Sequence, residues 1–395
     1  MTLTARRTTG PVTCLLVGVL AGGLLLGGCA GRYDPTLDAW PYPRVSGSGS
    51  VPPPLSGLPL FAGRWIEADP SRDLVMAETT DPRFVARFSF TSPRTLYFFD
   101  LGPGTEAETA AFLDGGRSVL FVGAVISPHH ARAVVARSLL LVDLEQGLLL
   151  DTISLSRDGI SRGLAVDRYK NRAFILHDNG LGDGSLQRVD LYGGQRVEEP
   201  TGTIPEGLGR KGVVLDRTAN TVFCLAGGQS SRPDFAPVTD QKDEGPALLA
   251  LDADSLTVIH RIALGERFQP RALAYEALRD RVYVLASREG GSELLVVGAA
   301  FADKRAAVNI PEETTDLVIS GGYAFMPGAH GIYIVDLDLE SLISRPYLPL
   351  ELTGEMVVSD DQSVALVSFQ AAQTSGPPGI AKIGLQSGNL MDVIQ

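Results

Sequence analysis

The sequence predicts an all-β protein whose main region, residues 59–395, consists of seven repeats of four short antiparallel strands. Three observations lead to this prediction. The region is longer than one ordinary hydrophobic core supports, a strand–turn–strand pattern recurs along it, and it has no long apolar run of helical period. Four-stranded sheets that recur in this way bury both faces when they pack in a closed ring. The expected fold is therefore a seven-bladed β-propeller.

The first pattern of each repeat is an apolar strand, a turn that begins with Asp, Glu or Ser, and a second apolar strand. The stretches "RGLAVDRYKNRAFIL" (162–176) and "KGVVLDRTANTVFCL" (211–225) show it clearly. Asp and Ser favour such turns because their side-chain oxygens accept hydrogen bonds from nearby backbone N–H groups. The expected turn residues, with spacings of 58, 40, 49, 60, 44 and 40 residues, are Asp69, Ser127, Asp167, Asp216, Glu276, Ser320 and Asp360.

A second pattern follows the first in each repeat and supplies the other two strands. It is an apolar strand that ends in Asp or Gly, a short turn and another strand, as in "LLALDADSLTVIHRI" (248–262) and "IYIVDLDLESLISRPY" (332–347). Together the two patterns predict four antiparallel strands per blade, joined by tight turns.

One repeat also resembles a known type of propeller repeat. The stretch "AVDRYKNRAFIL" (165–176), followed by "VDLYGGQRVEE" (189–199), resembles the YVTN-type repeat, in which a turn like "SPDG" leads to "YV" and then to "VID…TG". The resemblance covers most of residues 59–395. It implies the propeller fold and says little about function. No repeat has the Trp-Asp signature of WD40 propellers.

The first 28 residues have the pattern of a secretory signal. Arg6 and Arg7 precede an apolar run from Val12 to Leu26, and the first acidic residue is Asp34. The run is shorter than the roughly 20 apolar residues that a membrane-spanning helix needs. A cleaved signal is therefore favoured over a permanent membrane helix.

The end of this run resembles the lipobox of bacterial lipoproteins. It reads Leu26-Gly27-Gly28-Cys29. The resemblance implies cleavage before Cys29 and attachment of lipid to its thiol, and several acyl chains anchor a protein stably. The alternative is a plain signal peptide with an incidental cysteine. Because Ala30 rather than Asp follows, the periplasmic face of an outer membrane is the favoured location in the cell envelope.

Residues 29–58 are expected to be the lipidated cysteine and a flexible tether. Proline, glycine and serine dominate this segment, and it has no apolar periodicity. Loss of Arg6 and Arg7 with the signal takes the formal charge from −12 to −14. An acidic chain does not bind nucleic acid through its overall field, so no nucleic-acid partner is expected. Cys224 is the one cysteine left unmodified, which excludes a disulfide within the mature chain.

The start of each first strand is the expected binding position, because these starts surround the central channel of a propeller on one face, its top face. The residues five places before the turn residues are Arg64, Val122, Arg162, Lys211, Arg271, Thr315 and Glu355, and Arg210 adjoins Lys211. The four cations Arg64, Arg162, Lys211 and Arg271 predict a site for an anionic ligand or partner. In the alternative interpretation they pair with Glu355, Asp316 or neighbouring acids.

Long loops on the same face are the second candidate for binding. They span residues 227–246, 177–185 and 369–379, and the possible contact residues are His177, Asp178, Asp183 and His330. The stretch "DNGLGDG" (178–184) has too few acids for a calcium loop, so a glycine-rich turn is preferred. A fourth segment, residues 79–94 with Phe84, Phe88 and Phe90, either contacts a partner or folds down onto the first blade.

Reaction signatures are few. His129 and His130 are expected in a turn between first and second strands, on the bottom face, and the sequence has no serine elbow, zinc spacing, phosphate loop or haem motif. No catalytic residue, metal or cofactor is therefore predicted. The favoured interpretation is a binding or scaffold module for a protein partner or an envelope polymer. The alternative is an envelope enzyme, similar to propeller lactonases or quinoproteins, that acts on an anionic substrate. An enzyme would need His177 or His330 near an acid at the channel, and a quinone site would need more tryptophans than Trp40 and Trp65.

Overall fold

The computed structural model describes residues 61–394 with several short gaps. The gaps are 94–95, 102–104, 114–117, 127–133, 156–159, 179–182, 193–195, 206–207, 228–244, 299–303, 330, 345–347, 349–351, 353 and 370–377. The predicted signal, Cys29 and the tether lie outside the described residues, as do His129, His130 and His330. Within the described ranges, no helix has the length and the apolar character needed to cross a membrane.

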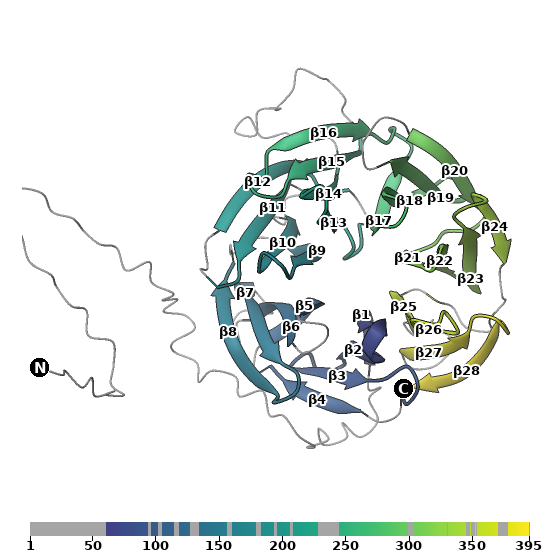
Figure 1. Ribbon diagram of the computed structural model, residues 1–395. Coiled ribbons are helices and arrows are strands. Elements are labelled where there is room, and N and C mark those ends of the chain that lie inside the picture. The colour runs from purple at the N-terminus through teal and green to yellow at the C-terminus, as the bar shows by residue number, and fades with distance from the viewer. Residues whose placement is uncertain are drawn as a thin grey trace, which may run out of the picture. The chain divides into compact units, whose positions relative to one another are not determined.

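The strands form seven four-stranded antiparallel sheets around a central axis, which confirms the predicted seven-bladed β-propeller (Figure 1). Blade 1 holds β1 (Phe61–Asp69), β2 (Leu74–Thr79), β3 (Phe84–Phe88) and β4 (Tyr97–Asp100), with the short helix η1 (Pro70–Arg72) after β1. Blade 2 holds β5 (Thr105–Leu113), β6 (Ser118–Ile126), β7 (Val134–Asp143) and β8 (Leu148–Ser154). Blade 3 holds β9 (Ile160–Asp167), β10 (Arg172–Asp178), β11 (Asp183–Asp190) and β12 (Arg196–Thr203).

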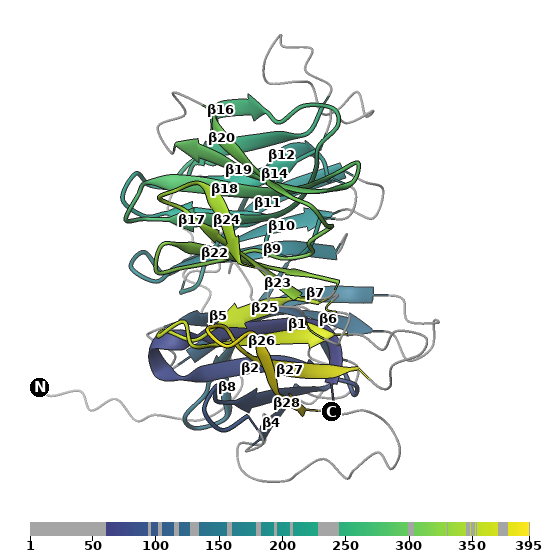
Figure 2. The same ribbon diagram turned by 90° about the vertical axis from the view of Figure 1, so that its right-hand side faces the viewer.

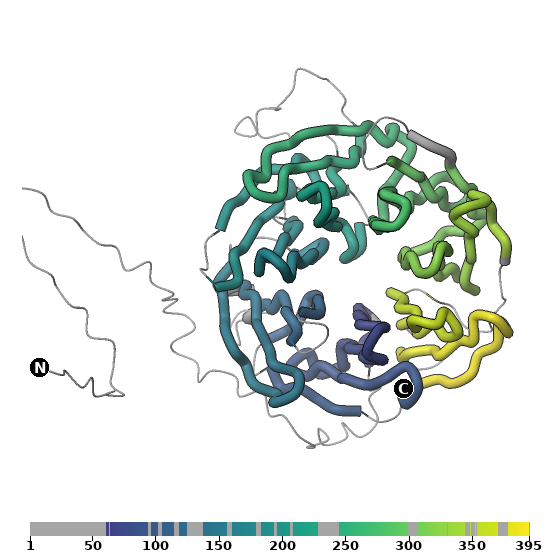
Figure 3. Tube along the Cα trace, in the orientation of Figure 1, coloured from purple at the N-terminus to yellow at the C-terminus, as the bar shows by residue number. Residues whose placement is uncertain are grey.

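The remaining four blades follow in chain order, as the progression of colour in Figure 3 shows. Blade 4 holds β13 (Val213–Asp216), β14 (Thr221–Ala226), β15 (Ala247–Asp252) and β16 (Val258–Ala263). Blade 5 holds β17 (Gln269–Glu276), β18 (Arg281–Arg288), β19 (Gly291–Gly298) and β20 (Lys304–Ile310). Blade 6 holds β21 (Val318–Ser320), β22 (Tyr323–Gly328), β23 (Gly331–Asp336) and β24 (Ser341–Ser344). Blade 7 holds β25 (Met356–Val358), β26 (Val364–Phe369), β27 (Gly379–Gly384) and β28 (Asn389–Ile394).

The turn chemistry that revealed the repeats works as expected in blades 3 and 4. Asp167 Oδ1 accepts hydrogen bonds from the N–H groups of Tyr169 and Lys170, at 3.1 and 3.2 Å. Asp216 makes the same pair of contacts in the next blade. Asn171 then takes a left-handed backbone conformation with φ of 52°, which asparagine tolerates better than most residues. Each hairpin therefore closes with its two apolar strands in register.

Blade 2 begins earlier than the sequence indicated. Its first strand is β5, and Ser127 falls between β6 and β7, not between the first and second strands. The assignment of Ser127 to the first hairpin of blade 2 was wrong. β6 and β7 are long apolar strands that flank Ser127 in the sequence, so this stretch has the same pattern as a first and second strand. The prediction for His129 and His130 stays untested, because both lie outside the described residues. The residue five places before the end of the first strand in blade 2 is Glu108, counted from Leu113 at the end of β5. It is not Val122, which lies within β6.

The phenylalanine-bearing segment 79–94 packs onto blade 1. It contains β3, and the side chains of Phe88 and Phe90 are buried against Phe61. The same hydrophobic cluster includes Leu366 and Ile380 of blade 7. The sequence left open whether this segment contacts a partner or folds onto the first blade, and in the structure it folds onto the first blade.

Neighbouring blades share hydrophobic clusters, so the sheet faces are buried on both sides. Every residue of β14 is buried, which explains its continuous apolar sequence. The ring closes between blade 1 and blade 7 by side-chain packing, because each of these blades is built from consecutive strands and neither borrows a strand from the other. In the side view the strands run across the thickness of the ring, from one face to the other (Figure 2).

Candidate functional site

The first strands β1, β5, β9, β13, β17, β21 and β25 line the centre of the ring in Figure 1. We call the face where these strands begin, together with the residues at their starts, the channel mouth. Arg64 lies in β1, Arg162 in β9 and Arg271 in β17, and Lys211 precedes β13. The structure therefore brings all four predicted cations to the channel mouth. What they contact there decides what the site can bind.

Two of the arginines are held by carboxylates. Arg64 Nε is 2.8 Å from Glu78 Oε2, and the same guanidinium forms a second ion pair with Glu106. Arg162 Nη2 is 3.1 Å from Asp178 Oδ2. The side chain of Arg64 remains 41% exposed and that of Arg162 remains 30% exposed. Both are fixed in direction yet accessible to a ligand.

The other two cations are paired as well. Lys211 Nζ is 2.7 Å from Asp316 Oδ2 and donates a second hydrogen bond, of 3.3 Å, to the carbonyl of Met356. Arg271 Nη2 is 2.7 Å from Glu313 Oε1. All four cations are therefore ion-paired, with Asp316 among the partners that the alternative interpretation named, and binding of an anionic ligand by these cations stays a prediction.

The same region links each blade to the next. At the 6–7 junction the Met356 N–H donates to Asp316 Oδ2 at 2.7 Å, and at the 7–1 junction the Ile66 N–H donates to Glu355 Oε2 at 3.3 Å. Backbone hydrogen bonds or side-chain contacts join the other five junctions: Arg64–Glu106, Ser161–Glu108, Gly212–Arg162, Leu273–Lys211 and Arg271–Glu313. Residues predicted to bind a ligand therefore also hold the ring together.

Three glutamates at the channel mouth are unusually weak acids. Burial raises the pKa of Glu67 to about 7, with Lys211 opposing the rise and Glu355 adding to it. Burial likewise raises the pKa of Glu355 to about 7, against the opposing charge of Arg210. Burial raises the pKa of Glu78 to about 7, although Arg64 and Arg210 favour its ionised form. The channel mouth therefore changes its charge near neutral pH.

Lys211 stays protonated at the centre of these acids. Burial alone would lower the pKa of its ammonium, but the carboxylates of Asp316, Glu355 and Glu67 raise it above the ordinary value. An ammonium of this kind is neither a nucleophile nor a general base at neutral pH. Its role is electrostatic.

The short segment Gly209–Gly212 carries both Arg210 and Lys211. The Gly209 N–H donates to the Arg271 carbonyl at 3.0 Å, and the Gly212 N–H donates to the Arg162 carbonyl at 2.9 Å. A Cβ atom on Gly212 would lie 2.7 Å from that carbonyl oxygen, so only glycine fits. Sequence reasoning noted Arg210 only as a neighbour of Lys211, and the two flanking glycines were the signal that this segment has a special geometry.

The predicted loop contacts have different outcomes. His177 is 2% exposed within β10, and its Nε2 atom is 3.1 Å from Gln187 Oε1. Burial lowers the pKa of its imidazole, so it is a neutral core residue and the prediction of a loop contact was wrong. Asp178 contributes to the channel mouth through Arg162, whereas Asp183 is buried at the start of β11. Across the described part of the chain, no group of three or more His, Cys, Asp or Glu residues is arranged to hold a metal ion.

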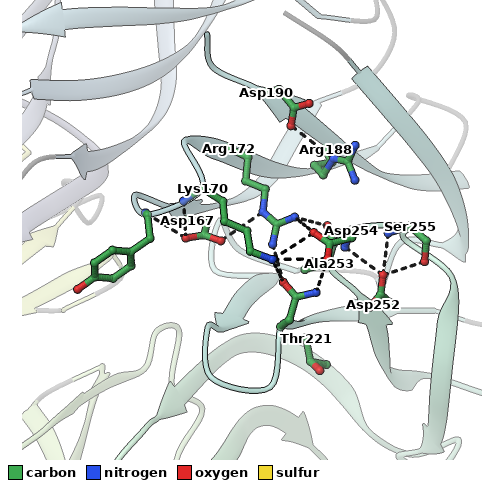
Figure 4. Close-up of polar contacts among 12 residues, drawn as sticks. Asp167, Lys170, Arg172, Arg188, Asp190, Thr221, Asp252, Ala253, Asp254 and Ser255 are labelled. Carbon is green, nitrogen blue, oxygen red and sulfur yellow. Dashed lines mark hydrogen bonds and ion pairs between the residues drawn. The ribbon is translucent and has the colours of Figure 1, made fainter. Parts of the chain in front are cut away.

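A second polar network lies at the turns of blades 3 and 4, on the opposite face. The buried guanidinium of Arg172 lies between Asp167 and Asp254, as Figure 4 shows. Its Nε is 3.2 Å from Asp167 Oδ2, and its Nη1 is 3.0 Å from the Ala253 carbonyl oxygen. Because each guanidinium nitrogen donates to an acceptor of blade 3 or blade 4, this network connects the two blades and is not a ligand site.

Comparisons with known proteins agree with the fold. No family model matches the chain, and no curated protein sequence is significantly similar to it. Among solved structures, the hydrazine synthase of Kuenenia stuttgartiensis is similar with a TM-score of 0.58 and 11% sequence identity. The match covers 81% of this chain and 94% of that chain. At this level of identity the similarity concerns the fold alone.

Proposed function

We propose that this protein is a lipid-anchored binding module of the cell envelope, which presents its channel mouth to a protein partner or an envelope polymer. The lipobox-like Leu26–Cys29 and the tether support the anchor and the location, which is the periplasmic side of an outer membrane. The observation that carries the binding role is the set of partly exposed, ion-paired cations around the channel mouth, above all Arg64 and Arg162. Charged groups already held in one direction lose little entropy when they bind a partner.

Catalysis is the weaker candidate because the described residues do not supply its chemistry. An enzyme of the lactonase-like or quinoprotein-like type was expected to place His177 or His330 beside an acid at the channel. His177 instead contacts an amide inside blade 3, and His330 lies outside the described residues. Lys211 keeps its proton. No observation favours a particular reaction.

A cross-linked pull-down from solubilised membranes tests the binding role. The full-length lipoprotein is compared with an Arg162→Gln/Arg271→Gln variant, which removes two cations of the channel mouth. The matched control, Arg168→Gln/Arg217→Gln, removes two cations from the turns on the opposite face. A partner captured by the wild type and the control, but lost by the channel-mouth variant, supports the proposal. Capture by all three chains places the binding site elsewhere, and capture by none refutes a stable protein partner.

The anchor is tested separately. A Cys29→Ser variant is expected to lose metabolic labelling by a radioactive fatty acid, which the wild type incorporates, because the lipid requires the cysteine sulfur. A wild type that incorporates no fatty acid would refute the lipoprotein assignment, and equal labelling of the two chains would show that Cys29 is not the lipidated residue.

A further inference from the structure

Two guanidinium nitrogens at the channel mouth have no acceptor for their N–H groups. They are Nη1 of Arg210 and Nε of Arg162, both buried and both without a hydrogen-bond partner among the described residues. A buried donor without an acceptor costs about 1–3 kcal/mol, and more when the group is charged. The two arginines come from adjacent blades, and the backbones beside them are bridged at Gly163 and Lys211. Such a pair is suited to receive acceptor atoms from a ligand.

The backbone that carries Arg210 is held in place from both sides. Gly209 is hydrogen-bonded to Arg271 of blade 5, and Gly212 is hydrogen-bonded to Arg162 of blade 3. Between them, the carbonyl of Lys211 accepts a 2.7 Å hydrogen bond from the Leu273 N–H. Because the backbone of this segment is fixed at three points, binding to Arg210 does not have to order it.

The surroundings of Arg210 select the charge of the ligand. Its guanidinium acts electrostatically on Glu78 of blade 1 and Glu355 of blade 7, which face it across the channel. Lys211, the next residue, is already committed to Asp316. A ligand with two or more negative charges would be repelled by these acids. A single carboxylate adds one charge and offers two oxygens that match the donors of a guanidinium.

We propose that Arg210, assisted by Arg162, binds the carboxylate group of a ligand at the channel mouth. The inference rests on the proposed function, because it names the ligand class recognised on the same face. The carboxylate supplies acceptor atoms to Arg210 Nη1 and Arg162 Nε, which have none among the described residues. The rest of the ligand extends away from the ring.

Binding is expected to weaken as the pH rises. Glu78 and Glu355 compete with the ligand for Arg210 once they are ionised, and burial raises the pKa of each to about 7. Below that pH both are largely neutral and leave the guanidinium to the ligand. Above it, their negative charges weaken the positive field of Arg210 and repel the carboxylate. The cations Arg64 and Lys211 lower the pKa of Glu78 and of Glu355 respectively, whereas Glu106 and Asp316 raise them.

Isothermal titration calorimetry on the full-length lipoprotein in detergent micelles tests the proposal. The probe is N-acetylalanine, the neutral control is N-acetylalaninamide, and inorganic phosphate is the multiply charged control. Titrations are run at pH 6 and pH 8 with the wild type, Arg210→Gln, Arg210→Lys and Arg217→Gln. Arg217 is the matched control, because it belongs to the same blade and lies at the turn on the opposite face. Folding of each variant is checked by urea unfolding.

We expect the carboxylate to bind and the amide and phosphate to bind much more weakly. Loss of one charged hydrogen-bonding partner should weaken binding of the carboxylate about tenfold or more in Arg210→Gln. The affinity of Arg210→Lys for the carboxylate should lie between those of the wild type and Arg210→Gln, since lysine keeps the charge and loses the planar guanidinium. Arg217→Gln should match the wild type, and the wild type should bind more weakly at pH 8 than at pH 6.

Equal binding of carboxylate and amide by the wild type overturns the proposal without any variant. Unchanged affinity in a folded Arg210→Gln also overturns it, and tighter binding of phosphate than of N-acetylalanine changes the ligand class. The pull-down separates these outcomes from the proposed function. A partner captured through the channel mouth with no carboxylate binding refutes only the site. Carboxylate binding without any captured partner refutes only the protein-partner role.

Discussion

Replacing Lys211 with methionine tests how much one central ammonium stabilises the ring. Methionine keeps an apolar stem of similar length and removes the charge. The carboxylate of Asp316, whose side chain is 3% exposed, then loses its cation. Breaking a buried ion pair from one side costs about 3–5 kcal/mol, and because 22% of the Lys211 side chain is exposed we expect about 3 kcal/mol. The cost is the free energy of unfolding lost by the variant at neutral to alkaline pH.

The pH dependence of this loss separates electrostatics from packing. The pKa values of Glu67 and Glu355 are raised by burial to about 7 from an ordinary 4.5, and Lys211 counteracts both rises. A carboxyl whose pKa is raised by folding stabilises the folded state fully at pH values below its unfolded-state pKa. This contribution to the free energy of unfolding is lost as the pH rises through about 7. Without Lys211 these ionisations become costlier. The variant should therefore lose more stability at pH 8 than at pH 5.5.

Urea unfolding followed by tryptophan fluorescence measures both effects. Trp65 is buried between blades 1 and 2, and a Trp40→Phe background makes it the sole tryptophan, since the chain has two. The control is Lys170→Met, which removes an exposed ammonium paired with Asp254 at 3.3 Å and should cost less than about 1 kcal/mol. A loss of unfolding free energy below about 1 kcal/mol in Lys211→Met would refute the reasoning, because breaking a buried ion pair costs several times as much as breaking an exposed one. An equal loss at the two pH values would also refute it.

Three further substitutions or reactions test other parts of the ring. Arg172→Ala should cost about 3 kcal/mol in urea unfolding, because it leaves the buried carboxylate of Asp167 unpaired between two blades, and Arg172→Lys should recover part of the loss. Gly212→Ala should cost about 1–3 kcal/mol and should weaken carboxylate binding, because its Cβ would lie 2.7 Å from the Arg162 carbonyl oxygen; an unchanged midpoint would show that the close approach is not required. Cys224 should not react with a thiol-specific disulfide reagent at pH 8 until urea unfolds the protein, because burial raises its pKa to about 12, and rapid labelling of the native chain would contradict this.

The repeats were readable from the sequence wherever local turn chemistry and alternation coincide. Asp167 and Asp216 accept the turn hydrogen bonds that their positions predicted, and the surrounding strands pair as expected. Blade 2 was misplaced because β5 is rich in alanine and carries four polar residues before its apolar end, whereas the two strands after it are more apolar. Strand signals report local burial, and they do not say which hairpin of a blade comes first.

The channel mouth shows the limit of the same reasoning. Counting back from the turns placed Arg64, Arg162, Lys211 and Arg271 around the axis, because each lies five residues before the last residue of its first strand. The count did not reveal that Glu78 comes from a second strand, or that Asp316 reaches Lys211 from two blades away. Those contacts join residues separated by 14 and 105 positions, and only ring closure brings the more distant pair together.

The sequence by itself determined the repeat number, the strand content and the places where cations would meet, since these follow from local periodicity and turn preferences. It also carries the lipobox-like signal, whose consequence for the anchor remains a prediction. Only the tertiary structure decided that the cations are paired with acids of their own and of other blades, that His177 is a core residue, and that Arg210 Nη1 lies buried without an acceptor. The physical reason is that charge and burial depend on every neighbour in space, whereas periodicity depends only on neighbours along the chain.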